Sequence, residues 1–252
     1  MEKNILPLSA QTREIILGSI LGDGSLKKHK GYRNARFSFR HSIEQKEYFE
    51  WKARQIKEIS SAESIFLQKA DGFSKNKKLR YQSKALPQLT EIYELTHKRK
   101  KFQIKRRWLN QMTALSLAIW WFDDGSLIVN SKRGVICTDG LEKNEVKKLV
   151  RYLEIVWGIK TKVAPVNRKR FGKQEQYWRI WFRSSEELKK FLRVIMPYVP
   201  CKEMLKKVLL VYKDSQLQQR WISEASKLSK FSFQEVSKAL DIKKSKMKHF
   251  RE

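Results

Sequence analysis

Cysteine is scarce in this chain, since its 252 residues include only Cys137 and Cys201, far apart in the sequence. A disulfide scaffold or a zinc knuckle needs several cysteines at close spacing, so both are excluded. Histidine is also sparse, with four scattered residues, so nothing supports a nuclease site built from clustered histidines. The two isolated cysteines favour a reducing compartment.

Long apolar runs are missing as well. No stretch of about 18 apolar residues occurs, so no membrane span is expected. The first residues, from Met1 to Pro7, lack the apolar segment of a secretory signal. We therefore expect an intracellular protein, in the cytoplasm, the nucleoid or an organelle matrix, that is not secreted and has no membrane partner.

Acidic residues are few for a chain so rich in charge. There are 26 Asp and Glu against 55 Lys and Arg, a formal net charge of +29. Such an excess opposes compaction of the chain and favours a polyanionic partner, most simply nucleic acid. A ribosome-like or membrane-surface protein that merely uses its charge is the alternative. Hydrophobic residues make up 41% of the chain, which is enough to form a core and argues against disorder.

A short motif occurs twice, each time at the end of an apolar run. The sequence Asp-Gly-Ser-Leu begins at Asp23 and again at Asp124, 101 residues later (124 − 23). Two carboxylates at the ends of two similar helices, in a very basic chain, indicate metal-ligating acids held over a nucleic-acid backbone. The alternative, an Asp that simply ends a helix, is unattractive because the helix dipole disfavours an acid there.

The segments that follow the two motifs repeat one order of elements. The first half predicts a basic loop (27–33), a strand (35–41), a helix (44–59), a hairpin (64–69 and 79–83) with a basic turn at 71–78, and a helix (86–95). The second half predicts a strand (135–138), a helix (143–157), a hairpin (161–166 and 177–183) with a turn at 167–173, and a helix from the cap at 184 to about 196.

This order predicts an α+β fold of two similar αββαββα repeats with antiparallel strand pairs. The expected boundaries are 1–112, 113–220 and a basic helical tail at 221–252, beyond the closure of both repeats. Within the tail, the segment from Phe233 predicts a helix, a short turn and a second helix, as in a helix-turn-helix. A surface helix with a frayed basic end is the alternative.

The predicted strands carry basic or polar residues at their outward positions. Arg and Gln suit base edges in a DNA groove, and Lys suits phosphates. An ordinary solvated strand face would carry both signs of charge, yet acidic residues are almost absent here. The DNA-binding candidates are Arg36, Ser38, Arg40, Arg80, Gln82, Lys160, Lys162, Arg179 and Arg183.

Two glycines in the first motif helix, Gly18 and Gly22, are four residues apart and share one face. Such spacing lets another helix approach closely, whereas each Gly in an ordinary helix interior costs about 1 kcal/mol against Ala. Tight packing of a second helix against this face is therefore expected.

At these residues the chain resembles the LAGLIDADG family of homing endonucleases. The nine-residue motif is similar to residues 16–24 (Ile-Leu-Gly-Ser-Ile-Leu-Gly-Asp-Gly) and 117–125 (Leu-Ala-Ile-Trp-Trp-Phe-Asp-Asp-Gly). The third position of the second copy is Ile119 rather than a small residue, so the helix interface must be asymmetric. The resemblance implies a monomer of two pseudo-symmetric repeats whose motif helices form a central two-helix interface. It also implies that the two saddle-shaped antiparallel sheets lie on the DNA major groove.

The resemblance also implies a catalytic site. Asp23 and Asp124, at the eighth motif position, are the implied ligands of Mg²⁺, for which Mn²⁺ can substitute. The backbone of Gly22 and of Asp123 completes the implied metal-binding set, while the Asp123 side chain suits a helix-end or supporting role. The implied activity is hydrolysis of both strands of double-stranded DNA across the minor groove, at a long asymmetric site, leaving 3′ overhangs.

In this family a lysine from each half often lies near the metal-bound water. Lys101, ahead of the second motif, and Lys206, in the second half, look like these residues and are the remaining catalytic candidates. A binding protein without cleavage, either a LAGLIDADG-derived regulator or an intron RNA maturase, is the alternative function. The tail favours a regulator somewhat, but a protein that only binds is expected to lose the acids, and both are present.

Overall fold

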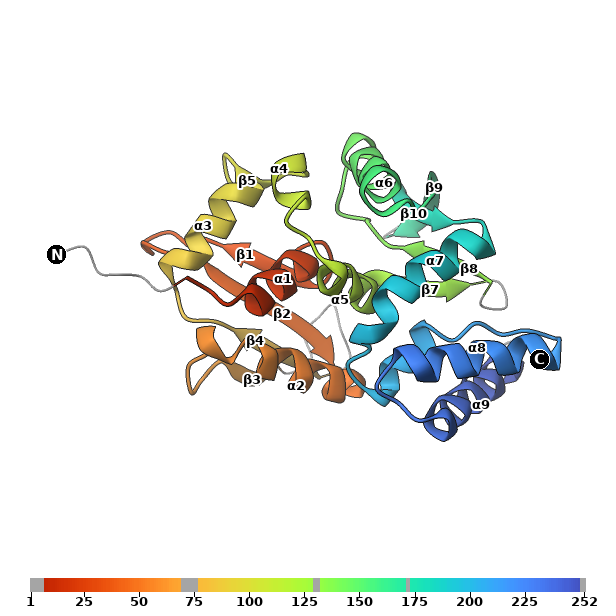
Figure 1. Cartoon of the computed structure of the whole chain (residues 1–252). Coiled ribbons are helices and arrows are strands. Elements are labelled where there is room, and N and C mark those ends of the chain that lie inside the picture. The colour runs from red at the N-terminus through yellow and green to blue at the C-terminus, as the bar shows by residue number, and fades with distance from the viewer. Residues whose placement is uncertain (1–6, 69–76, 129–131, 171–172, 250–252) are drawn as a thin grey trace. The chain divides into compact units, whose positions relative to one another are not determined.

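Two compact units make up the chain, and each contains a four-stranded antiparallel sheet (Figure 1). The first unit is Met1–Asp123 and the second is Asp124–Glu252. The computed structural model describes residues 7–68, 77–128, 132–170 and 173–249. This is the α+β fold, with antiparallel sheets in two similar halves, that the sequence repeat predicted.

In the first unit α1, α2 and α3 contact a sheet whose strand order is β1-β2-β4-β3. Its elements are α1 (Ala10–Ser19), β1 (Gly24–Lys27), β2 (Arg36–Ser42), η1 (Ile43–Gln45), α2 (Lys46–Gln55), η2 (Lys57–Ile59), β3 (Ile65–Gln68), β4 (Lys78–Gln82), α3 (Pro87–Thr96), β5 (His97–Lys98), β6 (Lys101–Phe102), α4 (Arg106–Leu109) and α5 (Ala114–Asp124).

Strand β2 separates a buried face of this sheet from a polar one. Phe37, Phe39 and His41 are buried, and the residues between them are half-buried or exposed. The ring of Phe39 stacks on that of Tyr81 in β4 at 5.0 Å between centroids. Burying each Phe side chain contributes about 1.5–3 kcal/mol, so the period-two pattern fixes which face of the strand meets the helices.

The two motif helices pack closely within the first unit, as the glycine spacing predicted. A Cβ on Gly18 would lie 2.3 Å from the carbonyl oxygen of Ser116 and 2.9 Å from Cβ of Ile119. A Cβ on Gly22 would lie 2.5 Å from Cβ of Asp123. Any larger residue at either position would push the two helices apart. The contact of Gly18 with Ile119 confirms that the interface is asymmetric.

This packing accounts for a unit boundary that differs from the expected 112/113. Helix α5 lies against α1, and the Ser116 hydroxyl donates to the carbonyl of Glu14 at 2.9 Å. Almost all of α5 therefore belongs to the first unit, and only its last residue, Asp124, begins the second.

In the second unit the strand order is β7-β8-β10-β9, which repeats the pattern of the first unit. Its elements are β7 (Gly125–Ile128), β8 (Arg133–Ile136), α6 (Lys143–Trp157), β9 (Lys162–Arg170), β10 (Lys173–Phe182), α7 (Ser185–Ile195), η3 (Met196–Tyr198), η4 (Lys202–Lys207), α8 (Ser215–Leu228) and α9 (Phe233–His249). Helix α6 contacts β9 and β10, and α7 contacts β8 and β10.

The caps of these helices follow the sequence closely. The Ser184 side chain accepts a hydrogen bond from the backbone N–H of Glu187 at the start of α7, as predicted. Gly158 ends α6 in the left-handed conformation at φ 66°, which a residue with a Cβ rarely adopts. Helix α6 spans the predicted residues 143–157.

Three local expectations need correction or lie outside the described residues. The basic loop expected at 27–33 begins one residue later, because β1 pairs with β2 from Gly24 to Lys27. The second hairpin is longer than predicted, because β9 and β10 extend through most of the expected turn at 167–173 and pair as far as Arg170 and Lys173. The basic turn predicted at 71–78 falls mainly on residues outside the described ranges.

The predicted helix-turn-helix in the tail is wrong, because residues 233–249 form one continuous helix, α9. The tail is also part of the second unit rather than an appendage. The indole N–H of Trp221 donates to the carbonyl of Val208 at 3.2 Å. Ile222, Val236 and Leu240 are buried as well. The apolar positions of α8 and α9 thus join the core of the second unit. Among the described residues, no helix is long and apolar enough to cross a membrane.

Candidate nucleic-acid interface and acidic site

Asp23 follows the turn that ends α1 and immediately precedes β1, so the motif acid lies at a junction of helix and strand. Its side chain is 40% exposed, and Oδ2 lies 3.4 Å from Nδ1 of His41, whose side chain is buried. His41 comes from the core-facing side of β2. The carboxylate is therefore partly open to solvent and lies near a buried histidine of the sheet.

Asp123, at the seventh position of the second motif, has the opposite environment. Its side chain is fully buried, and Oδ1 accepts from Nζ of Lys52 at 2.6 Å and from the Tyr48 hydroxyl at 2.7 Å. Its Oδ2 accepts from the backbone N–H of Asp23 at 3.3 Å. Lys52 neutralises this carboxylate, which in turn holds the backbone that carries the exposed acid.

Three side chains here offer ligand atoms close enough to share a metal ion. Atoms of Asp23, His41 and Asp123 all lie within 4.8 Å of one another. A hard cation such as Mg²⁺ takes carboxylate, water and phosphate oxygens, and the exposed Asp23 carboxylate fits that preference. The Asp123 carboxylate already accepts hydrogen bonds from Lys52 and Tyr48, so it suits a supporting role. The expected backbone ligands, at Gly22 and Asp123, stay predictions.

Asp124, the second motif acid, lies at the end of α5 and directly before β7. It is half-buried, and its carbonyl accepts from the backbone N–H of Cys137 at 3.1 Å. Burial raises the pKa of the Cys137 thiol, and the carboxylates of Asp139 and Asp124 raise it further, against the opposing effect of Arg179. The second unit therefore repeats the placement of an acid before a strand, next to a different set of side chains.

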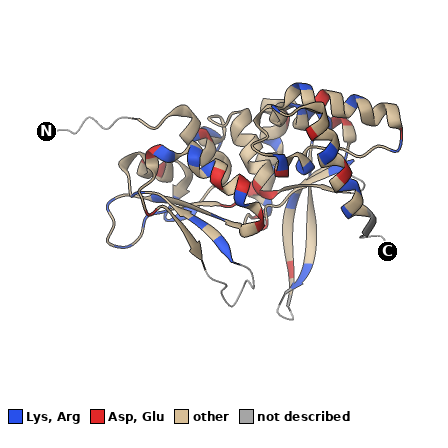
Figure 2. Ribbon diagram, turned by 90° about the horizontal axis from the view of Figure 1, so that it is seen from below, with Lys and Arg blue, Asp and Glu red and all other residues tan. Residues whose placement is uncertain are grey.

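The first sheet brings its five predicted DNA-binding residues to one face. Strand register pairs Ser38 with Gln82 and Arg40 with Arg80, and Arg36 lies two residues before Ser38 on the same side. This face is opposite the buried aromatic residues of β2. Lys and Arg recur along the strands of both sheets in Figure 2. A face of this composition can contact phosphates and base edges.

The second sheet meets this expectation only in part. Lys162 in β9 is exposed, as are Lys160 just before the strand and Arg183 just after β10. Arg179 differs, because it is buried and its Nε and Nη2 donate to the two carboxylate oxygens of Asp139 at 2.7 and 2.6 Å. That hydrogen bonding raises the pKa of Arg179. Its guanidinium is committed to Asp139, so the structure does not present it as an outward DNA contact.

The two candidate lysines have different surroundings. Lys101 is exposed in β6 and lines a shallow pocket with Lys98, Arg99 and Gln103. Its neighbour Lys100, at φ 63°, instead lines a pocket that also includes Gly24 and Ser25, next to the first motif acid.

Lys206, in the second half, lines a pocket together with Ser126, two residues after the second motif acid. Lys100 and Lys206 thus each line a pocket that includes residues shortly after a motif acid.

Several residues of these sites were missed by the sequence reasoning. Lys52 lies four residues after Tyr48 on the apolar face of α2, and a lysine in such a stripe signals a buried acidic partner. His41 continues the buried alternation of β2, which marks it as core-facing. Asp139 is an acid just after a strand in a basic segment, but nothing local identifies Arg179 as its partner.

Together, the duplicated α+β units, the acid before each first strand and the basic face of the first sheet are features expected of a protein that places an acidic site against a nucleic acid. The chain belongs to the LAGLIDADG DNA endonuclease family, which matches residues 13–191.

Comparisons with individual proteins agree with this membership. The structure is similar to that of the homing endonuclease I-WcaI bound to its DNA recognition sequence, with a TM-score of 0.68 and 25% identity, over 84% of this chain and 91% of that one. A probable intron-encoded endonuclease 1 of Wickerhamomyces canadensis is 28% identical over 79% of this chain and 84% of its own length. A cytochrome b mRNA maturase bI2 of Debaryomyces hansenii is 26% identical over 77% of this chain and 72% of its own.

The chain spans less than half the length of other curated relatives that it matches. Protein RecA of Mycolicibacterium flavescens, for example, is 27% identical over 206 residues, which are 76% of this chain and 45% of that protein.

Proposed function

We propose that this protein is a site-specific, metal-dependent endonuclease that cuts both strands of double-stranded DNA. The observation that carries the proposal is the exposed Asp23 carboxylate, held at the end of a motif helix beside a sheet with a basic face. An acid in the same sequence position, Asp124, opens the second unit. The family membership and the likeness to a DNA-bound homing endonuclease support it.

In this proposal the two motif acids are the metal ligands, one from each unit. Bound there, Mg²⁺, or Mn²⁺ in its place, would lower the pKa of a water and neutralise charge on the attacking and leaving oxygens. The buried pair of Lys52 and Asp123 fixes the backbone of Asp23, because the Asp123 carboxylate accepts from its N–H. On the sheet side, Nδ1 of His41 lies 3.4 Å from the Asp23 carboxylate.

The basic residues have two roles in the proposal. The polar face of the first sheet, together with Lys160, Lys162 and Arg183 in the second unit, contacts the DNA groove and its phosphates. Lys101 and Lys206 are proposed near the reacting water, with Lys100 as the alternative to Lys101 because it lines the pocket beside Gly24. The proposed product carries 3′ overhangs, from a long asymmetric site that a monomer recognises.

A maturase that binds RNA without cutting DNA is the second candidate, because one relative is a cytochrome b mRNA maturase. Selection of cleaved sites from a random duplex library in Mg²⁺ separates the two. We expect enrichment of one site, with 3′ overhangs in the sequenced ends. Tight binding of a defined site with no cleavage in Mg²⁺ or Mn²⁺ would leave the binding-only function.

A further inference from the structure

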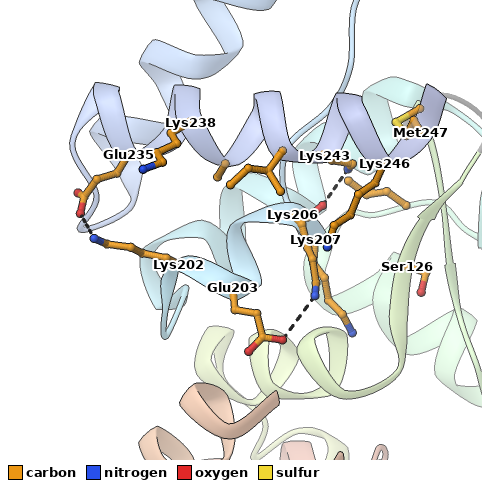
Figure 3. A pocket seen from close by; sticks show the side chains of 13 residues that line it. Ser126, Lys202, Glu203, Lys206, Lys207, Glu235, Lys238, Lys243, Lys246 and Met247 are labelled. Atoms are coloured by element: carbon orange, nitrogen blue, oxygen red, sulfur yellow. Dashed lines mark hydrogen bonds and ion pairs between the residues drawn. The ribbon is translucent and has the colours of Figure 1, made fainter. Parts of the chain in front are cut away.

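A lysine-lined pocket of about 580 Å³ lies in the second unit between η4, α9 and the start of β7 (Figure 3). Four of its lining residues are apolar, namely Leu127, Ala239, Ile242 and Met247. The described lysines that line it are Lys202, Lys206, Lys207, Lys238, Lys243 and Lys246.

The charge of this pocket is strongly unbalanced. Its six lining lysines face two lining glutamates, an excess of four (6 − 2) when all are ionised. Glu203 pairs with Lys206 at 3.4 Å and Glu235 with Lys202 at 2.8 Å, so both acids are engaged. Such an excess creates a positive potential that favours a bound anion.

The lysines of two separate elements converge in this pocket. Figure 3 shows the side chains of Lys206 and Lys207, from η4, and of Lys246, from α9, pointing into one region. Lys238 and Lys246 are exposed, and in the described part of the chain neither has an acidic partner. Ammonium groups brought together repel one another, and an anion between them removes that cost.

Lys243 fixes the two elements to each other. Its Nζ donates to the carbonyls of Lys206 and Leu209 at 2.8 and 2.7 Å. Burial lowers the pKa of Lys243 to about 7. This residue therefore anchors α9 on the end of η4 and holds the pocket walls, while Lys238 and Lys246 on the same helix are placed to meet a ligand.

The position of the pocket connects it with the motif acid of the same unit. Ser126 and Leu127, which line it, are in β7, the strand that begins directly after Asp124. The first unit has a basic pocket of about 470 Å³ at the corresponding strand β1, lined by Ser25, Lys27 and Lys100 among others. Helix α9 has no counterpart among the described elements of the first unit, so only the second pocket gains lysines from a tail helix.

We propose that η4 and α9 form a subsite for a phosphodiester of the DNA backbone, flanking the bond that the second unit acts on. This assignment rests on the proposed endonuclease function. The lysines suit the phosphate, and the apolar lining residues suit the carbon face of a deoxyribose. Aromatic side chains are absent from the described lining residues, so the pocket offers no platform for stacking a base.

The test uses the full chain with Lys238→Gln and Lys246→Gln combined, which leaves the η4 lysines intact. The matched control combines Lys227→Gln and Lys230→Gln, which removes the same charge from exposed positions of the tail outside the pocket. Affinity for a mixed-sequence duplex is measured over a range of salt concentrations. Each lost phosphate contact makes the log–log slope shallower by about 0.9, which is about an 8-fold loss of affinity at 0.1 M salt.

We expect the pocket variant to have a slope shallower by about 0.9, for the one lost phosphate contact, and the control to keep the slope of the unchanged protein. Equal slopes for the two variants would overturn the subsite. A protein with no salt-dependent DNA affinity at all would instead overturn the proposed function. The two failures are therefore distinguishable.

A second measurement identifies the phosphate. Neutral methylphosphonates are placed singly along the selected target duplex, and affinity is measured for the unchanged protein and the pocket variant. At one flanking position we expect the methylphosphonate to lower the DNA affinity of the unchanged protein. The affinity of the Lys238→Gln/Lys246→Gln variant should be nearly unaffected there, since its contact is already lost. Equal losses in both proteins at every position would refute a backbone subsite in this pocket.

Discussion

The buried ion pair of Lys52 and Asp123 gives the most direct test of how the first unit supports its motif acid. Both side chains are 0% exposed, and Nζ lies 2.6 Å from Oδ1. The lysine Nζ also lies 4.7 Å from the ring centroid of Tyr48 and 4.9 Å from that of Phe39. A charge left alone in these surroundings has lost its hydration without compensation.

Lys52→Met keeps most of the side-chain volume but leaves the Asp123 carboxylate buried without its cation, although the Tyr48 hydroxyl and the Asp23 N–H still donate to it. Removing one partner of a buried pair costs about 3–5 kcal/mol. At about 2–4 °C per kcal/mol for chains of this size, the melting temperature should fall by roughly 6–20 °C. Urea unfolding followed by circular dichroism measures the same loss as a free energy.

An exposed lysine on the same helix supplies the control. Lys46 pairs with Glu50 at 3.6 Å, with the two side chains 63% and 44% exposed. Pairs of this kind on a helix surface contribute about 0.3–0.5 kcal/mol, so Lys46→Gln should change the melting temperature very little.

The double variant Lys52→Met/Asp123→Asn completes the thermodynamic cycle. It removes both charges, so it should be more stable than the sum of the single losses implies, because no buried charge remains unpaired. Strictly additive losses, or a Lys52→Met protein as stable as the Lys46→Gln control, would refute the reasoning that this pair holds the unit together.

Further expectations concern the acids, the charge and the tail. Asp23→Asn and Asp124→Asn should each abolish or cripple cleavage and leave DNA binding largely intact, because losing a metal ion does not remove distant groove contacts. Asp123→Asn, assayed well below its melting temperature, should retain more cleavage activity than either. DNA affinity of the unchanged protein should fall with salt at a log–log slope near −7 for about 8 phosphate contacts, and a slope near zero would show that the charge is not used on DNA. A chain that ends at Arg220 should fail to give a folded second unit, because it lacks half of α8 and all of α9; a cooperative melt of that unit would contradict this. Burial lowers the pKa of Lys243 to about 7, so between pH 7 and about 10 the unfolded chain binds more protons than the folded one. The free energy of unfolding should therefore rise with pH over this range, and the rise should be smaller in Lys243→Met.

Local sequence patterns determined much of the fold. The alternation of apolar and polar residues predicted strand β2 and its buried face, because successive side chains along a strand point to opposite sides of a sheet. The glycine spacing in the first motif predicted a close helix neighbour, and Gly18 and Gly22 both meet α5 within a distance that excludes a Cβ. The repeated Asp-Gly-Ser-Leu motif identified the family, which the match over residues 13–191 confirms.

Only the tertiary structure decided which charged groups are available to bind a ligand and which are already paired within the protein. Lys52 and Asp123 are 71 residues apart, and Arg179 and Asp139 are 40 apart. Periodicity within one element cannot reveal such partners, so Arg179 was expected on an open face although Asp139 holds it. The tail shows the same limit, since the segment from Phe233 was expected to form a helix, a short turn and a second helix. Burial of Val236 and Leu240 and the anchoring of Lys243 on η4 instead stabilise one continuous helix. Sequence therefore determined the elements and the motif acids, whereas packing between distant segments decided which basic groups remain available to bind.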